Sequence, residues 1–464
     1  MFIYNRYTYT KLSIFVAFLI LFTATAHAQD GSRDNATTPQ IKVALGLDLM
    51  DTKITLPKGG TVFNPLKNKQ VADYSKSNEL SLRYNNNKFS VKGLNDLYSS
   101  LIFTPEKGSF IKFNNKEYRG TIRAVATKTG IWVVNNVDIE DYLYGVVPFE
   151  VPMSWNLEAV KAQAVAARTY AVRCLSQYGH GEFDVYDSTK DQVYGGISGE
   201  AEKAIEAVEG TRGIILSYQG WPIKAYYHAD AGGQTEEGKY IFPGDLPYLT
   251  SVPSKDDLET HRWHFILKKS ELAKSMKSWG KDVGEINNVQ ITAKSPTGRP
   301  RTIEVLGSKK SHEFSSNDFR KMIGAGRIRS TLFTIVGKND KPEDGTENVN
   351  VITVSPSDNL TGVQVMTASG IVRSVINEYY VLGSDGIGEI YEPDMKIITT
   401  DTGNVFKPKI DIEPGKDEFL LVGSGFGHGV GMSQWGAKSY ADDGWTYEEI
   451  LLHYYHGADL TIWY

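Results

Sequence analysis

A single acidic residue, Glu150, stands within the mostly apolar segment GVVPFEVPMSW, residues 145–155. Prolines at positions 148 and 152 stiffen the chain on both sides of this glutamate. Partial burial among apolar side chains disfavours the charged form of a carboxyl group and raises its pKa, as a general acid requires. The segment therefore predicts a catalytic acid. It also allows a glutamate that caps the following helix or pairs with a basic side chain.

One arginine lies at the edge of the apolar stripe of the helix that is predicted to follow. At about 100° per residue, Arg168 is close to the angular positions of Leu157 and Ala164. An arginine in that place needs an anionic partner. The sequence offers three: Glu150, an anionic substrate, or a structural acid such as Glu158.

Near the C-terminus, six glycines fall within the segment GSGFGHGVGMSQWGA, residues 423–437. This density indicates a backbone in dihedral regions that other residues avoid, or close contact with another group. We interpret the segment as a loop that presents His428 and Gln434 to a cleft, with pure turn architecture as the alternative. The glycine spacing differs from that of a dinucleotide-binding loop and no βαβ unit surrounds it, which argues against such a cofactor.

Metal binding and nucleophilic catalysis have weaker support. Six histidines have a spacing or loop position that metal ligands could share, but they form no convincing cage: His261 and His264, His453 and His456, His228 and His428. A Ser433/His428 pair lacks a nucleophile-elbow context and an evident orienting acid. With one cysteine, Cys174, the chain cannot form an intrachain disulfide or a cysteine-based zinc site. We expect neither a metal ion nor a cofactor.

The first residues have the composition of a signal peptide. Arg6 and Lys11 precede an apolar run at residues 12–22, and Ala26-His27-Ala28 offers a small-x-small cleavage site. The apolar run is about half of the length that a membrane-spanning helix needs. We expect cleavage after residue 28, secretion, and no membrane span in the mature chain. The formal net charge is −5, and the sequence contains no polybasic block. Both observations argue against nucleic acid as a partner.

The secondary structure expected along the chain indicates an α+β fold. Short β-type runs between turn signals fill residues 41–136, and the last two flank Lys128-Thr129-Gly130 as a hairpin would. A short helix is predicted at residues 138–144, followed by a loop that carries Glu150. An alanine-rich stretch with Ser154 or Asn156 as N-cap then predicts the central helix, which stops near residue 179.

Further helices are expected at residues 199–208, 270–278 and 316–323, with strands between them. A shift in composition at residues 338–417 predicts an inserted, mostly β subdomain. The predicted organisation is therefore a signal peptide at 1–28, a flexible leader at 29–40, a first catalytic part at 41–337, the insert, and a C-terminal catalytic part at 418–464.

Three segments together resemble the SpoIID/LytB domain family, that of stage II sporulation protein D and the amidase enhancer. They are GVVPFEVPMSWNLEAVKAQAVAARTYAV, YYHADAGGQTEE followed by PYLTSVPS, and GFGHGVGMSQWGAKSYADDGWTYEEILLHYYHGADL. The resemblance implies a peptidoglycan lytic transglycosylase that is cell-wall associated and acts on glycan strands stripped of stem peptides.

Within the resemblance, the catalytic glutamate is Glu150. The residues that match polar cleft positions are Lys161, Gln163, Arg168, Tyr170, His228, His428 and Gln434. Some members bind zinc through a histidine and cysteines near the second segment. Here Asp230 and Ala231 stand in HADAGG without a cysteine, so no zinc is expected. Trp155 is expected to add an aromatic surface to the cleft.

A lytic transglycosylase takes its nucleophile, the 6-hydroxyl of N-acetylmuramic acid, from the substrate and so needs no second carboxylate. The rival readings are a non-catalytic wall-binding module that stimulates an amidase, a muramidase, and a metal-dependent amidase. The expected partners are peptidoglycan glycan strands and, as a candidate, a cell-wall amidase.

Overall fold

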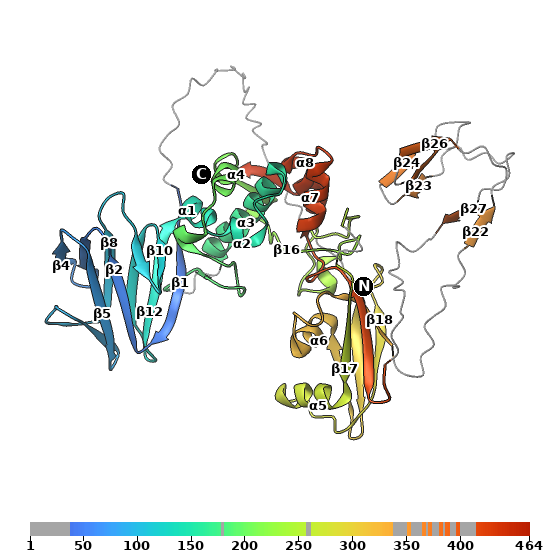
Figure 1. Cartoon of the computed structure of the whole chain (residues 1–464), viewed down its shortest axis with the longest axis horizontal. Helices are drawn as coiled ribbons and strands as arrows, with labels where there is room; N and C mark the ends of the chain where they lie inside the picture. The colour runs from blue at the N-terminus through green and yellow to red at the C-terminus, as the bar shows by residue number, and fades with distance from the viewer. Residues whose placement is uncertain are drawn as a thin grey trace, which may run out of the picture. The chain divides into compact units, whose positions relative to one another are not determined.

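The computed structural model describes residues 38–177, 181–256, 261–336 and 414–464, with six short strands between residues 350 and 399 (Figure 1). Helices and mostly antiparallel sheets are both present, which confirms the α+β prediction. The predicted signal peptide, and the leader up to residue 37, lie outside the described residues. In the part of the chain that is described, no helix is long and apolar enough to cross a membrane.

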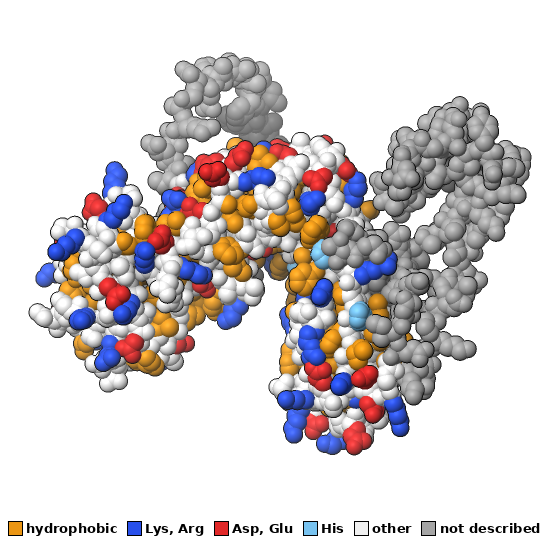
Figure 2. All heavy atoms as spheres, in the orientation of Figure 1, with side chains coloured by type: hydrophobic (Ala, Val, Ile, Leu, Met, Phe, Trp, Pro, Cys, Tyr) orange, Lys and Arg blue, Asp and Glu red, His pale blue; other side chains and the backbone are white. Residues whose placement is uncertain are grey.

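Two sheets form the N-terminal part, and most of their buried side chains belong to one hydrophobic cluster. The first is ordered β13 (Val185–Tyr186), β1 (Gln40–Leu49), β12 (Ile131–Asp138), β11 (Thr121–Ala126), β8 (Ser100–Pro105), β3 (Gly60–Asn64), β4 (Lys69–Tyr74). The second is ordered β10 (Lys116–Tyr118), β9 (Ile111–Phe113), β2 (Asp51–Leu56), β5 (Asn78–Asn85), β6 (Lys88–Val91), β7 (Leu97–Tyr98). The antiparallel pairing of β11 with β12 confirms the predicted hairpin. Acidic and basic side chains are interspersed over the visible face of these sheets in Figure 2.

A group of helices follows, in which α3 contacts all the others (Figure 1). They are α1 (Ile139–Tyr144), α2 (Val147–Glu150), α3 (Leu157–Gln177), α4 (Glu202–Glu209), α7 (Gln434–Asp442) and α8 (Tyr447–Tyr454), with a 3-10 turn at Gly196–Gly199. Six alanines of α3 are fully or almost fully buried, which lets neighbouring backbones approach closely: Ala159, Ala162, Ala164, Ala166, Ala167 and Ala171. The side chain of Asn156 accepts a bond from the Glu158 N–H at 3.0 Å, as predicted for an N-cap.

Two small sheets join distant segments to this helical group. One is ordered β15 (Trp221–Pro222), β14 (Ile214–Tyr218), β30 (Asp459–Ile462), and the other pairs β16 (Tyr227–His228) with β29 (Met432–Ser433) in parallel. A 3-10 turn, Gly238–Tyr240, follows β16 in the sequence. The pairing of β16 with β29 brings the YYHADAGG segment beside the glycine-rich segment.

A second hydrophobic cluster is built from residues 263–336 and β28. Its sheets are ordered β17 (Trp263–Lys268), β28 (Glu418–Ser424), β21 (Leu332–Val336) and β18 (Ile286–Lys294), β19 (Pro300–Gly307), β20 (Ser311–Ser315), and its helices are α5 (Lys269–Ser278) and α6 (Ser316–Ile323). Both helices agree with the predicted ranges.

Within residues 338–417 the described strands form three antiparallel pairs. They are β22 (Asn350–Thr353) with β27 (Lys396–Thr399), β23 (Gln364–Thr367) with β24 (Gly370–Arg373), and β25 (Tyr380–Gly383) with β26 (Gly386–Glu389). The boundaries of an inserted subdomain, and of the two catalytic parts on either side, stay predictions.

Candidate active site

Glu150 is the last residue of α2, a helix of one turn, and its side chain is half-buried. The predicted loop is therefore wrong at this point. Pro148 stands in the first turn, where its missing N–H leaves no helical bond unmade. The Val151 N–H donates to the Val147 carbonyl at 3.2 Å, after which the chain becomes extended.

The carboxylate of Glu150 accepts hydrogen bonds from two neutral side chains, Tyr227 and Gln434. Burial is the largest influence on its pKa and raises it, while the two hydrogen bonds act in the opposite direction. The net direction is upward, as the sequence predicted. Neither partner is basic, so within the described residues Glu150 does not form the ion pair that the sequence also allowed.

A chain of hydrogen bonds leads to the Tyr227 hydroxyl. The hydroxyl of Tyr142 donates to Gln192 Oε1 at 3.2 Å, and Gln192 Nε2 donates to Tyr227 Oη at 3.2 Å. Burial and the nearby carboxylate raise the pKa of Tyr227 well above its ordinary value, so Tyr227 stays a neutral donor to Glu150. Because every donor in this chain points the same way, the bonds strengthen one another.

Gln434, the first residue of α7, joins Glu150 to the central helix. Its Nε2 donates to Gln163 Oε1 at 3.2 Å, and Gln163 is fully buried on α3. Ser433 precedes it as the N-cap of α7 and donates its hydroxyl to Asp256. The structure therefore brings the predicted residues Gln163 and Gln434 together beside Glu150. It uses Ser433 as a cap rather than as a nucleophile.

His428 and His228 support this arrangement from the glycine-rich segment and β16. The Val430 N–H donates to His428 Nδ1 at 3.1 Å, and His428 also bonds to the backbone of Tyr227. Burial lowers the pKa of His428 to about 3, so the ring is neutral. His228 Nδ1 lies 3.1 Å from the Val430 carbonyl, and burial lowers its pKa well below the ordinary value. Both rings fix the backbone around Tyr227.

Comparison with known proteins shows which family the chain resembles. The family model described as "Stage II sporulation protein" matches residues 127–218, which include Glu150 and α3, and a domain of unknown function (DUF8618) matches residues 250–356. An amidase enhancer of Bacillus subtilis (strain 168) is 30% identical over 393 residues, 82% of this chain and 50% of that protein. The chain belongs to the SpoIID/LytB family.

In two further relatives, the match with this chain covers a larger share of the relative's length. The stage II sporulation protein D of Bacillus subtilis (strain 168) is 27% identical over 343 residues, 71% of this chain and 76% of that protein. An uncharacterized protein of Brachyspira hyodysenteriae is 27% identical over 363 residues, 78% of this chain and 76% of that protein. The present chain spans only half of the length of the amidase enhancer.

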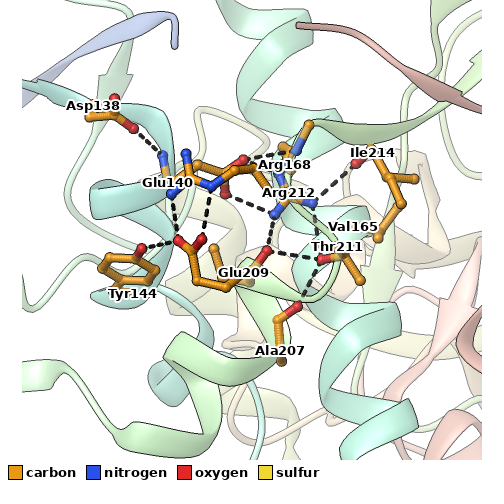
Figure 3. Close-up of polar contacts among 12 residues, drawn as sticks. Asp138, Glu140, Tyr144, Val165, Arg168, Ala207, Glu209, Thr211, Arg212 and Ile214 are labelled. Carbon is orange, nitrogen blue, oxygen red and sulfur yellow. Dashed lines mark hydrogen bonds and ion pairs between the residues drawn. The ribbon is translucent and has the colours of Figure 1, made fainter. Parts of the chain in front are cut away.

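Arg168 has a structural role in this SpoIID/LytB chain, which corrects its prediction as a substrate ligand. The side chain is fully buried, and Nε and Nη2 bind the carboxylate of Glu140 at 2.9 and 2.8 Å (Figure 3). Its remaining N–H groups reach the carbonyls of Val208 and Ile214 at 3.0 and 3.1 Å. The partner is thus a structural acid, although it is Glu140 and not Glu158.

Lys161 and Tyr170 lie on α3 but bind acids other than Glu150. Lys161 Nζ lies 2.8 Å from Glu158 Oε1, and the Tyr170 hydroxyl donates to Asp191 Oδ1 at 2.6 Å. Both side chains are partly exposed, so they remain candidate ligands of a substrate.

Among the described residues, no three His, Cys, Asp or Glu side chains gather as a metal ion would require. Asp230 in HADAGG instead accepts bonds from the Gly232 N–H at 2.7 Å and pairs with His261 Nδ1 at 2.8 Å. Burial and the nearby Asp256 raise the pKa of Asp230 to about 6. The contacts of Asp230 with Gly232 and His261 therefore give this residue a structural role.

Trp155 belongs to the core and not to a cleft surface, so that expectation is wrong. Its side chain is 7% exposed and packs edge-on against Trp435, with ring centroids 5.1 Å apart. The residues that sequence reasoning missed are Tyr227, Gln192 and Tyr142. Tyr227 had a signal, since it precedes His228 in a family segment, whereas Gln192 and Tyr142 lie outside the three segments.

Proposed function

We propose that the chain is a peptidoglycan lytic transglycosylase with Glu150 as its general acid and base. It cleaves the bond between N-acetylmuramic acid and N-acetylglucosamine in peptide-free strands and leaves 1,6-anhydro ends. The observation that carries the proposal is the half-buried Glu150 carboxyl, whose pKa is raised by burial while two neutral donors bind it. Family membership supports the coarser part, a role related to the cell wall.

In the first step the protonated Glu150 donates its proton to the glycosidic oxygen, and the bond from that oxygen to C1 of the muramic acid breaks. The carboxylate then accepts the proton of the muramic acid 6-hydroxyl while O6 bonds to C1. Tyr227 and Gln434 stabilise the negative charge that Glu150 carries between these steps. Burial favours the acid before the first step, and the two donors limit the cost of its ionisation.

The types of side chain that bind Glu150 favour a nucleophile that comes from the substrate. A glycosidase that uses water ordinarily needs a second carboxylate about 5 to 9 Å from the first. Among the described residues, the side chains that bind Glu150 are a tyrosine and a glutamine, neither of which is an acid. This supports a transglycosylase over a muramidase.

The test is digestion of purified, peptide-free glycan strands by the protein alone, with mass spectrometry of the products. The proposal predicts anhydro ends. Products with reducing ends would assign a muramidase. Sensitivity to chelators would instead assign a metal-dependent enzyme.

A second candidate function is a non-catalytic, wall-binding enhancer of an N-acetylmuramoyl-L-alanine amidase. It is favoured by the 30% identity to a protein named amidase enhancer. In this case the protein alone would release nothing from the strands, and it would raise the rate of a purified amidase on intact wall. In either case the predicted signal peptide supports a secreted, cell-wall associated protein.

A further inference from the structure

Phe149, the residue before Glu150 on α2, has an aromatic side chain that is 51% exposed. Its other side is seated against two glycines. A Cβ atom placed on Gly195 or Gly199 would lie only 2.1 or 2.3 Å from the ring. Neither glycine has a positive φ, so a larger residue at either position would be opposed by the ring of Phe149 in its present place and not by the backbone conformation.

The segment that supports the ring also supports the candidate acid. Gln192, three residues before Gly195, donates to Tyr227. The segment is anchored in turn, because the Gly195 N–H donates to the Gly145 carbonyl at 2.9 Å and the Tyr194 hydroxyl donates to Asn135 at 3.1 Å. The ring of Phe149 and the carboxyl of Glu150 are therefore fixed relative to the same stretch of chain.

We propose that Phe149 is a sugar-stacking residue that binds the pyranose ring next to the one whose bond is cut. The face of an aromatic ring is electron-rich and apolar, and it suits the C–H face of a sugar. Consecutive side chains on a helix diverge by about 100°, so the ring lies to the side of Glu150 rather than over the atom that it protonates. This inference rests on the proposed function and names a subsite of the same site.

Rigid support of the aromatic ring should increase its affinity for a sugar. An exposed aromatic side chain that is free to rotate loses conformational freedom when it binds a ligand, which reduces affinity. The contacts with Gly195 and Gly199 hold the ring before any sugar arrives. An alanine at Gly195 should displace the ring without removing it, and this gives a test of position apart from chemistry.

The experiment measures binding of peptide-free glycan strands by the inactive Glu150→Gln protein. In that background, Phe149→Ala is expected to raise the dissociation constant roughly five- to tenfold, while Phe149→Trp keeps it within about twofold. Gly195→Ala is expected to weaken binding as Phe149→Ala does. The matched control is Trp279→Ala at the end of α5, where an aromatic side chain is 42% exposed, and it should leave binding unchanged.

The outcomes separate this inference from the function on which it rests. If the Glu150→Gln parent binds strands and Phe149→Ala binds them equally well, the stacking role is wrong and the function stands. Equal losses for the alanine and tryptophan variants of Phe149 would also overturn it, since an aromatic face would then not be what binds. Failure of the parent to bind any glycan would remove both.

Discussion

Glu150 must hold a proton before the glycosidic bond breaks and carry a negative charge afterwards. Burial favours the first state, and the hydrogen bonds from Tyr227 and Gln434 favour the second. The net upward shift of the pKa shows that burial dominates. The protonation of Glu150 therefore depends on a balance that substitutions of single residues can move in either direction.

Glu150→Gln is expected to change how the free energy of unfolding depends on pH. The carboxyl loses its proton near the ordinary value of 4.5 in the unfolded chain and at higher pH in the folded one. Between these values the folded state binds more protons, so the stability of the unaltered protein falls as pH rises. The variant lacks this fall, and its melting temperature should exceed that of the unaltered protein at neutral pH but not in acid.

Glu209→Gln is the control of opposite sign in the same melting series. The bond from Arg212 lowers the pKa of Glu209, so this carboxylate contributes stability above the ordinary pKa and loses it as pH falls. Glu209→Gln should therefore be the less stable protein at neutral pH, by a small amount because the pair is partly exposed. If both variants change in the same direction, burial does not raise the pKa of Glu150.

Tyr227→Phe is expected to shift the pH profile of glycan cleavage. Loss of the hydroxyl removes a bond that lowers the pKa of Glu150, so this pKa rises further. The alkaline limb of the rate profile, which reports loss of the acid, should move to higher pH while the maximal rate falls because the carboxylate is less stabilised. Tyr84→Phe, whose hydroxyl donates to the Thr127 carbonyl in the N-terminal sheets, should leave the profile in place. If the alkaline limb of the Tyr227→Phe profile stays in place, the Tyr227 hydroxyl does not lower the pKa of Glu150.

Glu150 could be recognised from the sequence because its setting is local, an acid between prolines and apolar residues. Its partners were only partly predictable. Gln434 was among the residues expected in the cleft, but Tyr227 was not, because it lies far along the chain on β16, which its pairing with β29 brings beside the glycine-rich segment. The partner of Arg168 was likewise not predictable from the sequence. Helical spacing placed it beside an apolar stripe, but its acid comes from α1, which packs across α3.

The buried pair of Glu140 and Arg168 joins several elements of the helical group. Besides the arginine on α3, Glu140 accepts bonds from the Gly213 N–H at 3.0 Å and from the hydroxyl of Tyr464. One carboxylate of α1 thus connects the central helix, the turn before β14 and the C-terminal residue. Its role is to hold the elements that carry Glu150.

Glu140→Gln is expected to destabilise the fold by about 3 kcal/mol, because it leaves the guanidinium of Arg168 buried without its counter-charge. Denaturant unfolding measures the loss. The double variant Glu140→Gln with Arg168→Met should be more stable than Glu140→Gln alone, since it also removes the uncompensated charge. A single variant as stable as the unaltered protein would mean that the pair is not buried in solution.

At the same scale, elements with a clear sequence pattern were predictable, the six-residue helix α1 among them, and the shortest elements were not. The alanine spacing gave α3, and α6 was found at its observed bounds. The four residues of α2 and the two of β16 are too short for any periodicity, and they exist because tertiary contacts stabilise them. The candidate acid stands on one of these elements and its hydroxyl donor on the other.

At the scale of the whole molecule, the described residues form two main hydrophobic clusters, and the candidate site belongs to the first. The α+β class followed from the mixture of predicted elements. The predicted insert at 338–417 and the role of the second cluster are separate questions from the chemistry of Glu150, because none of the residues that bind its carboxyl comes from either.

The most direct test of the account compares the unaltered protein with Glu150→Gln on peptide-free glycan strands, with no other protein present. Mass spectrometry of the released fragments is the measurement. We expect 1,6-anhydro-muramic acid ends from the unaltered protein and none from the variant, which should remain folded by its melting curve. Equal release of anhydro fragments by both proteins would contradict the assignment of Glu150 as the catalytic acid and base.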